Sequence, residues 1–342
     1  MKSLPVLGWL TAGMFLAVSA GCQRGPAKTK VAFVTNNPES FWSIAEAGTK
    51  KAAAEEDVEV LFKMPSIGDA AKQKEIIDTV LGQGIKALAV SVIEPENQRD
   101  YLNDISKKVP LLTQDNDAPD TQRKCYIGTD NYKAGKAAGQ LVKEAMPDGG
   151  VIVIFVGDIK PINARLRRQG LLDELAGVKD AEGKQYGKYR LIDTITDQPD
   201  GASECKRKAI DQLTRAELQK EKHICLIGLW AYNPPMIRSA VLDMAKERLD
   251  HGEIKIVGFD EDTSTLQGIA DGSIYGTVVQ QPFVFGYEAV KMMAAIARGD
   301  NSKVPANGLR YVPHRVITKE GGKDRMPVEK FRKELEELLG TK

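Results

Sequence analysis

The stretch CYIGTDNYKAGKAAG, residues 125–139, lies where one half of the sequence pattern ends and the other begins. Its apolar start, residues 125–128, predicts a buried strand. Thr129, Asp130 and Asn131 follow, and such side chains accept hydrogen bonds from the free N–H groups of a helix start, so a helix is expected from residue 132. Gly135 and Gly139 share one helical face, where a second backbone can approach closely.

Alternating strand and helix patterns lie on both sides of this stretch. Before it, apolar runs at 30–35, 58–63, 87–92 and 109–114 alternate with helical segments, and a second series runs from 151 to about 279. Continuous apolar strands are typical of parallel sheets covered on both faces. Strand-helix-strand order requires right-handed crossovers. The sequence therefore predicts an α/β protein with two similar doubly wound parallel-sheet lobes and a ligand cleft between them.

Three crossings between the lobes are expected, near Thr129-Asp130, Gln281-Pro282 and Pro313. They assign residues 30–129 and 282–312 to an N-terminal lobe, and residues 130–281 and 313–342 to a C-terminal lobe. Three crossings predict a hinge that bends about one axis and restrains twist. A ligand that touches both lobes would bind the closed form better than the open form.

The N-terminus has the pattern of an export signal. Lys2 precedes an apolar run, residues 4–20, and small residues precede Cys22. This pattern is typical of a secretory signal peptide, and Cys after Ala-Gly resembles the bacterial lipobox. We expect a lipoprotein signal peptide over residues 1–21, a flexible tether over 22–29, and lipid attachment at Cys22. The protein would then be anchored by lipid in the periplasm or at the outer cell surface; a plain signal peptide with an incidental Cys is the alternative.

Composition limits the classes of partner. The 342 residues suit two domains, and 48 Lys and Arg against 47 Asp and Glu leave a net charge of +1. This balance argues against nucleic acid as the partner. Cys125, Cys205 and Cys225 lack metal-ligand spacing, so we expect no metal and no cofactor. A Cys205–Cys225 disulfide stays open.

Polar and aromatic side chains follow the predicted strands. Ligands of open parallel sheets bind beyond the carboxyl ends of the strands. The residues expected there include no evident nucleophile paired with a base, so we expect no catalytic residue and no enzyme. The candidate ligand-binding residues are Asn36, Asn37, Phe41, Trp42, Asp115, Asn116, Arg165, Trp230, Asn233, Asp260 and Gln280.

These residue types suit a neutral sugar. Sugar hydroxyls donate and accept hydrogen bonds, and vicinal hydroxyls match the two oxygens of a carboxylate or the fork of an arginine. The apolar C–H faces of a sugar can lie against aromatic rings. A phosphate or dinucleotide site would need a Gly-rich turn at a helix start, and the first loop, NNPESFW, has none.

The chain resembles the periplasmic sugar-binding proteins of ABC transporters, of the ribose-binding-protein type, at VAFVTNNP…FW, PLLTQDND, IGTDNYKAGKAAG, NARLRRQG, IVGFDED and GTVVQQP. The resemblance covers nearly the whole mature chain. It implies a monomer that binds a monosaccharide and delivers it to an ABC transporter permease. By position it implies first-loop contacts for Asn37, Phe41 and Trp42, a first-lobe carboxylate for Asp115, a second-lobe guanidinium for Arg165, and further polar contacts for Asn233, Asp260 and Gln280.

The chain departs from the ribose pattern at three places. Two extra residues separate Pro38 from Phe41, so either Asn36 or Asn37 is the implied contact. Asn116 stands where the ribose pattern has an arginine, and Trp230 adds a large ring.

Three other functions stay open. LacI-type repressors share the two-lobed fold but carry a DNA-binding segment where this chain has an export signal. A retaining sugar hydrolase would need two carboxylates about 5 Å apart, for which Asp115 and Asp260 are candidates. A sugar-sensing subunit for a chemoreceptor or kinase is not separable from a transport protein by sequence.

Overall fold

The computed structural model describes residues 1, 27–198 and 200–340. The expected signal peptide, residues 2–21, and the lipid-attachment residue Cys22 lie outside the described residues, as do positions 23–26 of the expected tether. Among the helices described, none is long and apolar enough to cross a membrane.

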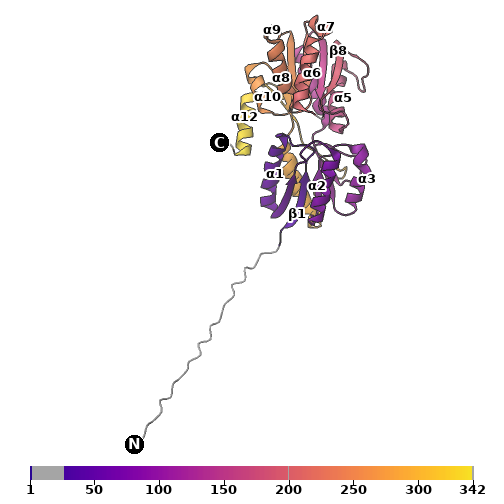
Figure 1. Ribbon diagram of the computed structural model, residues 1–342, viewed down its shortest axis with the longest axis vertical. Helices are drawn as coiled ribbons and strands as arrows, with labels where there is room; N and C mark the ends of the chain where they lie inside the picture. The colour runs from indigo at the N-terminus through magenta and orange to yellow at the C-terminus, as the bar shows by residue number, and fades with distance from the viewer. Residues whose placement is uncertain (2–26, 199, 341–342) are drawn as a thin grey trace.

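The described residues form two α/β lobes, one above the other in Figure 1. The first lobe contains β1 (Thr29–Val34), α1 (Phe41–Glu56), β2 (Val58–Lys63), α2 (Ala70–Gly82), β3 (Leu88–Val90), α3 (Pro95–Ser106), β4 (Leu111–Gln114), β5 (Cys125–Gly128), α11 (Pro282–Ala297) and β12 (Leu309–Tyr311). The second lobe contains α4 (Asn131–Ala145), β6 (Gly150–Val156), α5 (Ile162–Ala176), β7 (Gln185–Tyr186), β8 (Tyr189–Thr196), α6 (Ala202–Thr214), α7 (Ala216–Gln219), β9 (Ile224–Gly228), α8 (Asn233–Met244), α9 (Lys246–Asp250), β10 (Ile254–Phe259), α10 (Thr263–Asp271), β11 (Gly276–Val279), β13 (Arg315–Thr318), β14 (Met326–Pro327) and α12 (Val328–Leu339).

The two sheets repeat one strand order. The first runs β12-β5-β4-β3-β1-β2 and the second β14-β13-β11-β10-β9-β6-β8-β7. Strands β5-β4-β3-β1-β2 therefore correspond to β11-β10-β9-β6-β8, and all neighbours within these two sets pair in parallel. Among the strands of the described residues, the antiparallel pairs are β11 with β13 and β7 with β8. The predicted fold class, two parallel-sheet lobes, is confirmed.

The chain passes between the sheets at three places. It leaves the first sheet after β5, returns after β11, and leaves again between β12 and β13. Strands β12 and β13 are thus close in sequence but lie in different lobes. Helix α11 follows the second series in sequence, but its apolar face lies in the core of the first lobe with residues of β1 and β4.

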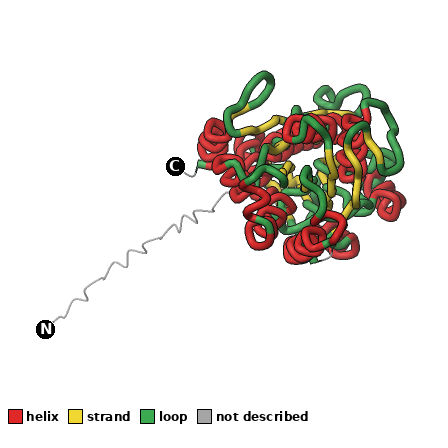
Figure 2. Tube along the Cα trace, turned by 90° about the horizontal axis from the view of Figure 1, so that it is seen from above, coloured by secondary structure: helices red, strands yellow, loops and turns green. Residues whose placement is uncertain are grey.

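Each sheet has an apolar core on both faces, and Figure 2 shows the helices around the strands. Cys205 and Cys225 are both buried and free. Cys205 belongs to the core on one face of the second sheet and Cys225 to the core on the other face. The sheet therefore separates the two thiols, and the disulfide that the sequence left open does not form.

Glycines let one pair of helices come close in each lobe. A Cβ added at Gly135 of α4 would lie 2.2 Å from the carbonyl oxygen of Arg167 in α5, and one at Gly170 would lie 2.1 Å from that of Tyr132. This contact confirms the close backbone approach predicted for the glycine face of α4. A glycine also allows a close helix contact in the first lobe, because a Cβ at Gly48 of α1 would lie 2.0 Å from the carbonyl oxygen of Phe283 in α11.

Gly135→Ala should therefore destabilise the protein. The new methyl group must push α4 and α5 apart, and overpacking of this kind costs about 1–3 kcal/mol. Gly82→Ala is the matched control, because Gly82 is also helical and an added Cβ meets nothing within 4 Å. The control should be neutral or stabilising by up to about 1 kcal/mol. Urea unfolding measures both free energies, and equal stabilities would contradict the packing argument.

Candidate functional site

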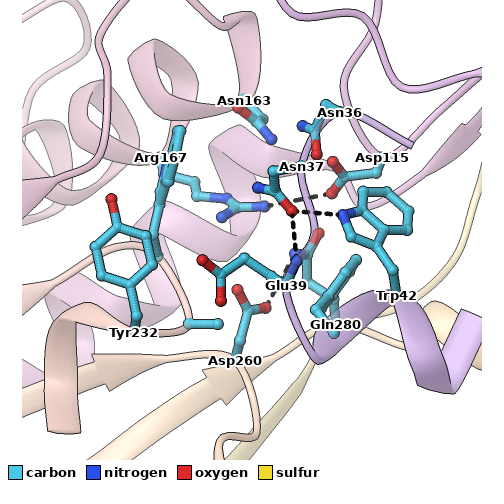
Figure 3. A pocket seen from close by; sticks show the side chains of 13 residues that line it. Asn36, Asn37, Glu39, Trp42, Asp115, Asn163, Arg167, Tyr232, Asp260 and Gln280 are labelled. Carbon is cyan, nitrogen blue, oxygen red and sulfur yellow. Dashed lines mark hydrogen bonds and ion pairs between the residues drawn. The ribbon is translucent and has the colours of Figure 1, made fainter. Parts of the chain in front are cut away.

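A cavity lies between the lobes, at the carboxyl ends of the strands. Figure 3 shows the side chains that converge on it from both lobes. The lining residues are Asn36, Asn37, Glu39, Phe41, Trp42, Asp115, Asn163, Arg167, Trp230, Ala231, Tyr232, Asp260 and Gln280. Eight of them were predicted from the sequence: Asn36, Asn37, Phe41, Trp42, Asp115, Trp230, Asp260 and Gln280.

The loop after β1 and the start of α1 make the first-lobe wall. The indole Nε1–H of Trp42 donates a 2.8 Å hydrogen bond to Asn37 Oδ1, which also accepts from the Glu39 backbone N–H at 3.2 Å. Phe41 packs edge-on against Trp42, with ring centroids 4.9 Å apart. Asn37 therefore holds the indole in place, while Asn36 Oδ1 is buried without a hydrogen-bond partner.

Two aspartates present carboxylates from equivalent places in the two lobes. Asp115 follows β4 and Asp260 follows β10, and each is about 5% exposed. Both have left-handed backbones, with φ of 59° and 66°. The Asp115 N–H donates to the carbonyl of Ile127 in β5, and the Asp260 N–H donates to that of Val278 in β11. Each strand end thus turns its carboxylate into the gap between the lobes.

Arg167 supplies the guanidinium of the cavity. Its Nε donates to Asn131 Oδ1 at 2.8 Å and its Nη1 to the Leu229 carbonyl at 3.0 Å. The guanidinium carbon lies 4.1 Å from the centre of the Phe259 ring. The remaining nitrogen, Nη2, makes no hydrogen bond and lies 4.0 Å from Asp115 Oδ1 across the cleft. Arg167 is 2% exposed, so its open donor faces the cavity and not bulk solvent.

Arg165, the arginine predicted from the sequence, lies outside the cavity. Its Nη2 pairs with Glu96 Oε1 of the first lobe at 2.7 Å, and both side chains are substantially exposed. Helix α5 begins at Ile162 and not at residue 165. Positions 163 and 167 then share the face toward the cavity, whereas position 165 points about 200° away from 167 around the helix. The phase of α5 therefore places Arg167, and not Arg165, in the cavity.

Asn116 and Asn233, also predicted as ligand contacts, do not line the cavity. Asn116 donates to the Val92 carbonyl, and its Oδ1 accepts from the Asn163 backbone N–H at 3.1 Å, which connects the lobes. Asn233 Oδ1 accepts from the Trp230 backbone N–H at 3.0 Å, and its Nδ2 donates to Asp197 at 2.9 Å. Both amides are thus engaged within the protein.

Four cavity residues have buried polar atoms without a hydrogen-bond partner. These are two donors, Arg167 Nη2 and Trp230 Nε1, and two acceptors, Asn36 Oδ1 and Gln280 Oε1. Buried polar groups in proteins are nearly always paired. Their convergence on one space indicates a ligand that both donates and accepts hydrogen bonds.

Burial disfavours the charged forms of the cavity carboxyl groups and so raises their pKa values. Burial raises the pKa of Asp260 to about 6, although Arg167 and the 3.0 Å hydrogen bond from Gln280 Nε2 oppose the shift. Burial also raises the pKa of Asp115, against the effect of Arg167 and of the hydroxyl of Ser91. At Glu39 burial, and then the charge of Asp262, raise the carboxyl pKa. A ligand that donates hydrogen bonds would stabilise the charged forms.

Five lining residues were absent from the sequence prediction: Glu39, Asn163, Arg167, Ala231 and Tyr232. Pro161 was a usable signal for two of them, because proline is common where helices begin and so marks α5 as starting before residue 165. Glu39 is one of the two extra residues of the first loop, and no sequence signal indicated that it lines the cavity. Within the described residues, no group of three or more His, Cys, Asp or Glu side chains could hold a metal ion.

Comparisons with known proteins agree with this architecture. The model of a family described as periplasmic binding protein domain matches residues 31–301. A ribose import binding protein of Haemophilus influenzae is 21% identical over 313 residues, covering 90% of this chain and 98% of that protein. A D-apiose import binding protein of Paraburkholderia graminis is 24% identical over 280 residues, covering 78% and 80%.

Solved structures share the fold. A glucose-galactose binding protein of Geobacillus stearothermophilus aligns with a TM-score of 0.75 at 24% identity, over 86% of this chain and 99% of that one. A carbohydrate transporter solute binding protein of Agrobacterium radiobacter, in complex with D-arabinose, aligns with a TM-score of 0.77 at 22% identity, over 92% and 100%. The family model covers most of the sequence, and the resemblance noted in the sequence motifs is confirmed: this chain belongs to the periplasmic binding protein domain family.

Proposed function

We propose that this chain is a solute-binding protein that captures a monosaccharide between its lobes and delivers it to the permease of an ABC transporter. The observation that carries the proposal is the set of unpaired donors and acceptors around the cavity, beside four aromatic rings. Hydroxyl groups satisfy both kinds of atom, and C–H faces suit the rings. The relatives named above are import binding proteins, which supports binding and delivery and not catalysis.

Residue roles follow from the geometry. Asp115 and Asp260 would accept hydrogen bonds from hydroxyl groups on opposite sides of the sugar. Arg167 Nη2 and Trp230 Nε1 would donate to ring or hydroxyl oxygens, while Asn36 and Gln280 would use their free oxygens as acceptors. Phe41 and Trp42 would cover one face of the sugar ring. The ligand thus contacts both lobes and binds the closed form better than the open form.

Closure would be assisted by two ion pairs between the lobes, which we place at the mouth of the cleft. Lys160 Nζ pairs with Glu94 at 2.8 Å, and Arg165 pairs with Glu96 at 2.7 Å. Each pair joins the second lobe to the region where α3 begins in the first lobe. Both pairs are partly exposed, so each is worth at most about 1 kcal/mol.

A thermal-stability screen tests the proposed function. D-ribose, D-xylose, L-arabinose, D-glucose and D-galactose are added separately to the protein. One of them, at a hundredfold excess over its Kd, should add about 2.7 kcal/mol of stability and be recovered unchanged. Chemical alteration of the sugar would indicate an enzyme, and no stabilisation by any monosaccharide would refute the proposal.

Asp260→Asn should raise the Kd of the stabilising sugar about 10- to 100-fold, because a charge-assisted hydrogen bond becomes a neutral one. Since the pKa of Asp260 is about 6, its acceptor form is lost below that pH. Wild-type affinity should therefore fall as the pH drops from 7 to 5, and less steeply in the variant. Asp193→Asn, at an exposed position of β8, is the control. Calorimetric titration at both pH values gives the constants; equal affinity of wild type and Asp260→Asn would exclude this role.

Closure is tested by scattering and kinetics. The radius of gyration should fall when the sugar saturates the wild type, and an unchanged radius would contradict the hinge mechanism. Reversing both mouth charges, Lys160→Glu with Arg165→Glu, should speed sugar dissociation by about five- to thirtyfold, mainly through opening of the cleft. Lys206→Glu is the control, because its partner Asp243 lies in the same lobe. A dissociation rate as low as that of the wild type would show that the pairs do not hold the closed form.

The anchoring proposal rests on the lipobox-like sequence before Cys22. A lipid on this residue would hold the protein at the outer face of a membrane, near the permease. Cys22→Ser should move the protein from the detergent phase to the aqueous phase in a Triton X-114 partition, or leave it as an uncleaved precursor. Unchanged partitioning would rule out lipid attachment at this cysteine.

A further inference from the structure

We propose that Asp197 is a positioning residue that, through Tyr232 and Asn233, fixes the aromatic wall of the cavity in the second lobe. This wall consists of the rings of Trp230 and Tyr232. The inference rests on the proposed function, since it explains how the wall is held ready for a sugar. Asp197 does not line the cavity. It follows β8, which is separated by two strands, β6 and β9, from β10, the strand that Asp260 follows.

The carboxylate of Asp197 is fully buried and holds two side chains of the loop after β9. Its Oδ1 accepts a hydrogen bond from the Tyr232 hydroxyl, and its Oδ2 accepts from Asn233 Nδ2 at 2.9 Å. Asn233 Oδ1 in turn accepts from the Trp230 backbone N–H at 3.0 Å. One carboxylate therefore holds Tyr232 and Asn233 directly, and it holds the backbone of Trp230 through Asn233.

The wall depends on this placement. The rings of Trp230 and Tyr232 meet edge to face, with centroids 6.1 Å apart. They occupy space that Gly157 leaves free, because a Cβ there would lie 2.1 Å from the Trp230 ring and 2.6 Å from the Tyr232 hydroxyl oxygen. The Tyr232 hydroxyl also accepts from Gln198 Nε2 at 3.1 Å. Tyr232 thus presents its ring to the cavity, while Trp230 presents its unpaired Nε1–H.

A structural role in the core alone would not require these contacts. Burial raises the pKa of Asp197 to about 6, so the charged form carries a cost that an apolar residue would avoid. The carboxylate has two acceptor oxygens and no donor, and the groups that face it are donors: the Tyr232 hydroxyl, Asn233 Nδ2 and the Cys205 thiol. An acceptor opposite Asn233 Nδ2 leaves Asn233 Oδ1 free for the Trp230 N–H, and the second acceptor lets the Tyr232 hydroxyl donate.

This donor–acceptor order suggests a swap experiment. In Asp197→Asn, the new amide can reproduce only one of the two native contacts. With its NH₂ toward Asn233, two NH₂ groups face each other. With its NH₂ toward Tyr232, the hydroxyl accepts that bond and loses the carboxylate to which it donated, so one native hydrogen bond is lost in either orientation. The double variant Asp197→Asn/Asn233→Asp restores all three bonds. The amide at 197 then accepts from Tyr232 and donates to the carboxylate at 233, whose second oxygen accepts from Trp230.

Two measurements report on the placement of the aromatic wall. The first is the Kd of whichever sugar of the five-sugar panel stabilises the wild type most. The second is the emission of Trp230 without sugar, in a Trp9→Phe/Trp42→Phe background of the full chain, where Trp230 is the remaining one of three tryptophans. Asp193→Asn, at an exposed position of the same strand, is the matched control.

Asp197→Asn should raise the Kd about 10- to 100-fold and shift Trp230 emission to longer wavelength. The swap should bring both values back toward wild type, and the control should change neither. Wild-type affinity and emission in Asp197→Asn would overturn the proposal, as would loss of folding stability with both values unchanged. A folded swap variant without recovery would overturn it as well.

If Asp197→Asn does not fold, Tyr232→Phe tests the proposal instead. This variant keeps the aromatic ring and removes the hydroxyl that donates to Asp197. It should weaken binding severalfold, and wild-type affinity would overturn the proposal. If no sugar of the panel binds the wild type, the proposed function fails, but the emission of Trp230 in the single and swapped variants still tests the positioning role.

Discussion

The buried guanidinium of Arg167 is the contact on which the cavity depends. A buried charge is tolerated only where partners replace its water. Arg167 has partners from three parts of the second lobe: Asn131 at the start of α4, the carbonyl of Leu229 after β9, and the ring of Phe259 in β10. These contacts use two of its nitrogens and one face, and they aim the third nitrogen at the cavity. The same helix pair, α4 and α5, can hold this position because glycines let its backbones approach.

The two lobes deliver their carboxylates by the same local geometry. Asp115 and Asp260 end corresponding strands in left-handed conformations, which aspartate tolerates better than most residues. Their backbone carbonyls are held by hydroxyl groups from the adjacent strands, Tyr126 for Asp115 and Thr277 for Asp260. A left-handed backbone at a non-glycine residue costs about 1–3 kcal/mol and is found where the surroundings determine it. The repetition of this turn gives a ligand one acceptor from each lobe.

Sequence patterns predicted what depends on strand and helix periodicity. The two-lobed fold, the glycine contact of α4 and the cavity positions of Asp115 and Asp260 follow from residues that end strands or share a helical face. Arg165 was chosen by position from the family resemblance, but in α5 it points about 200° away from Arg167, whose side chain lies in the cavity. Asn233 was chosen because it follows a strand, but its amide is engaged by a buried partner far away in sequence, Asp197. Tertiary hydrogen bonds of this kind leave no periodic signal.

In the proposed hinge closure, the balance between open and closed forms would follow from which polar groups closure buries. Four cavity atoms have no hydrogen-bond partner among the described residues, and each unsatisfied buried group costs about 1–3 kcal/mol. The two ion pairs at the mouth, Lys160 with Glu94 and Arg165 with Glu96, return at most about 1 kcal/mol each. The pairs alone therefore do not offset closure around an unsatisfied cavity. A change from 1:99 to 99:1 in favour of the closed form needs about 5.5 kcal/mol, which a ligand that satisfies three or four of these atoms supplies. In this proposal the mouth pairs would adjust how long the closed form lasts, whereas the cavity atoms would decide whether it forms.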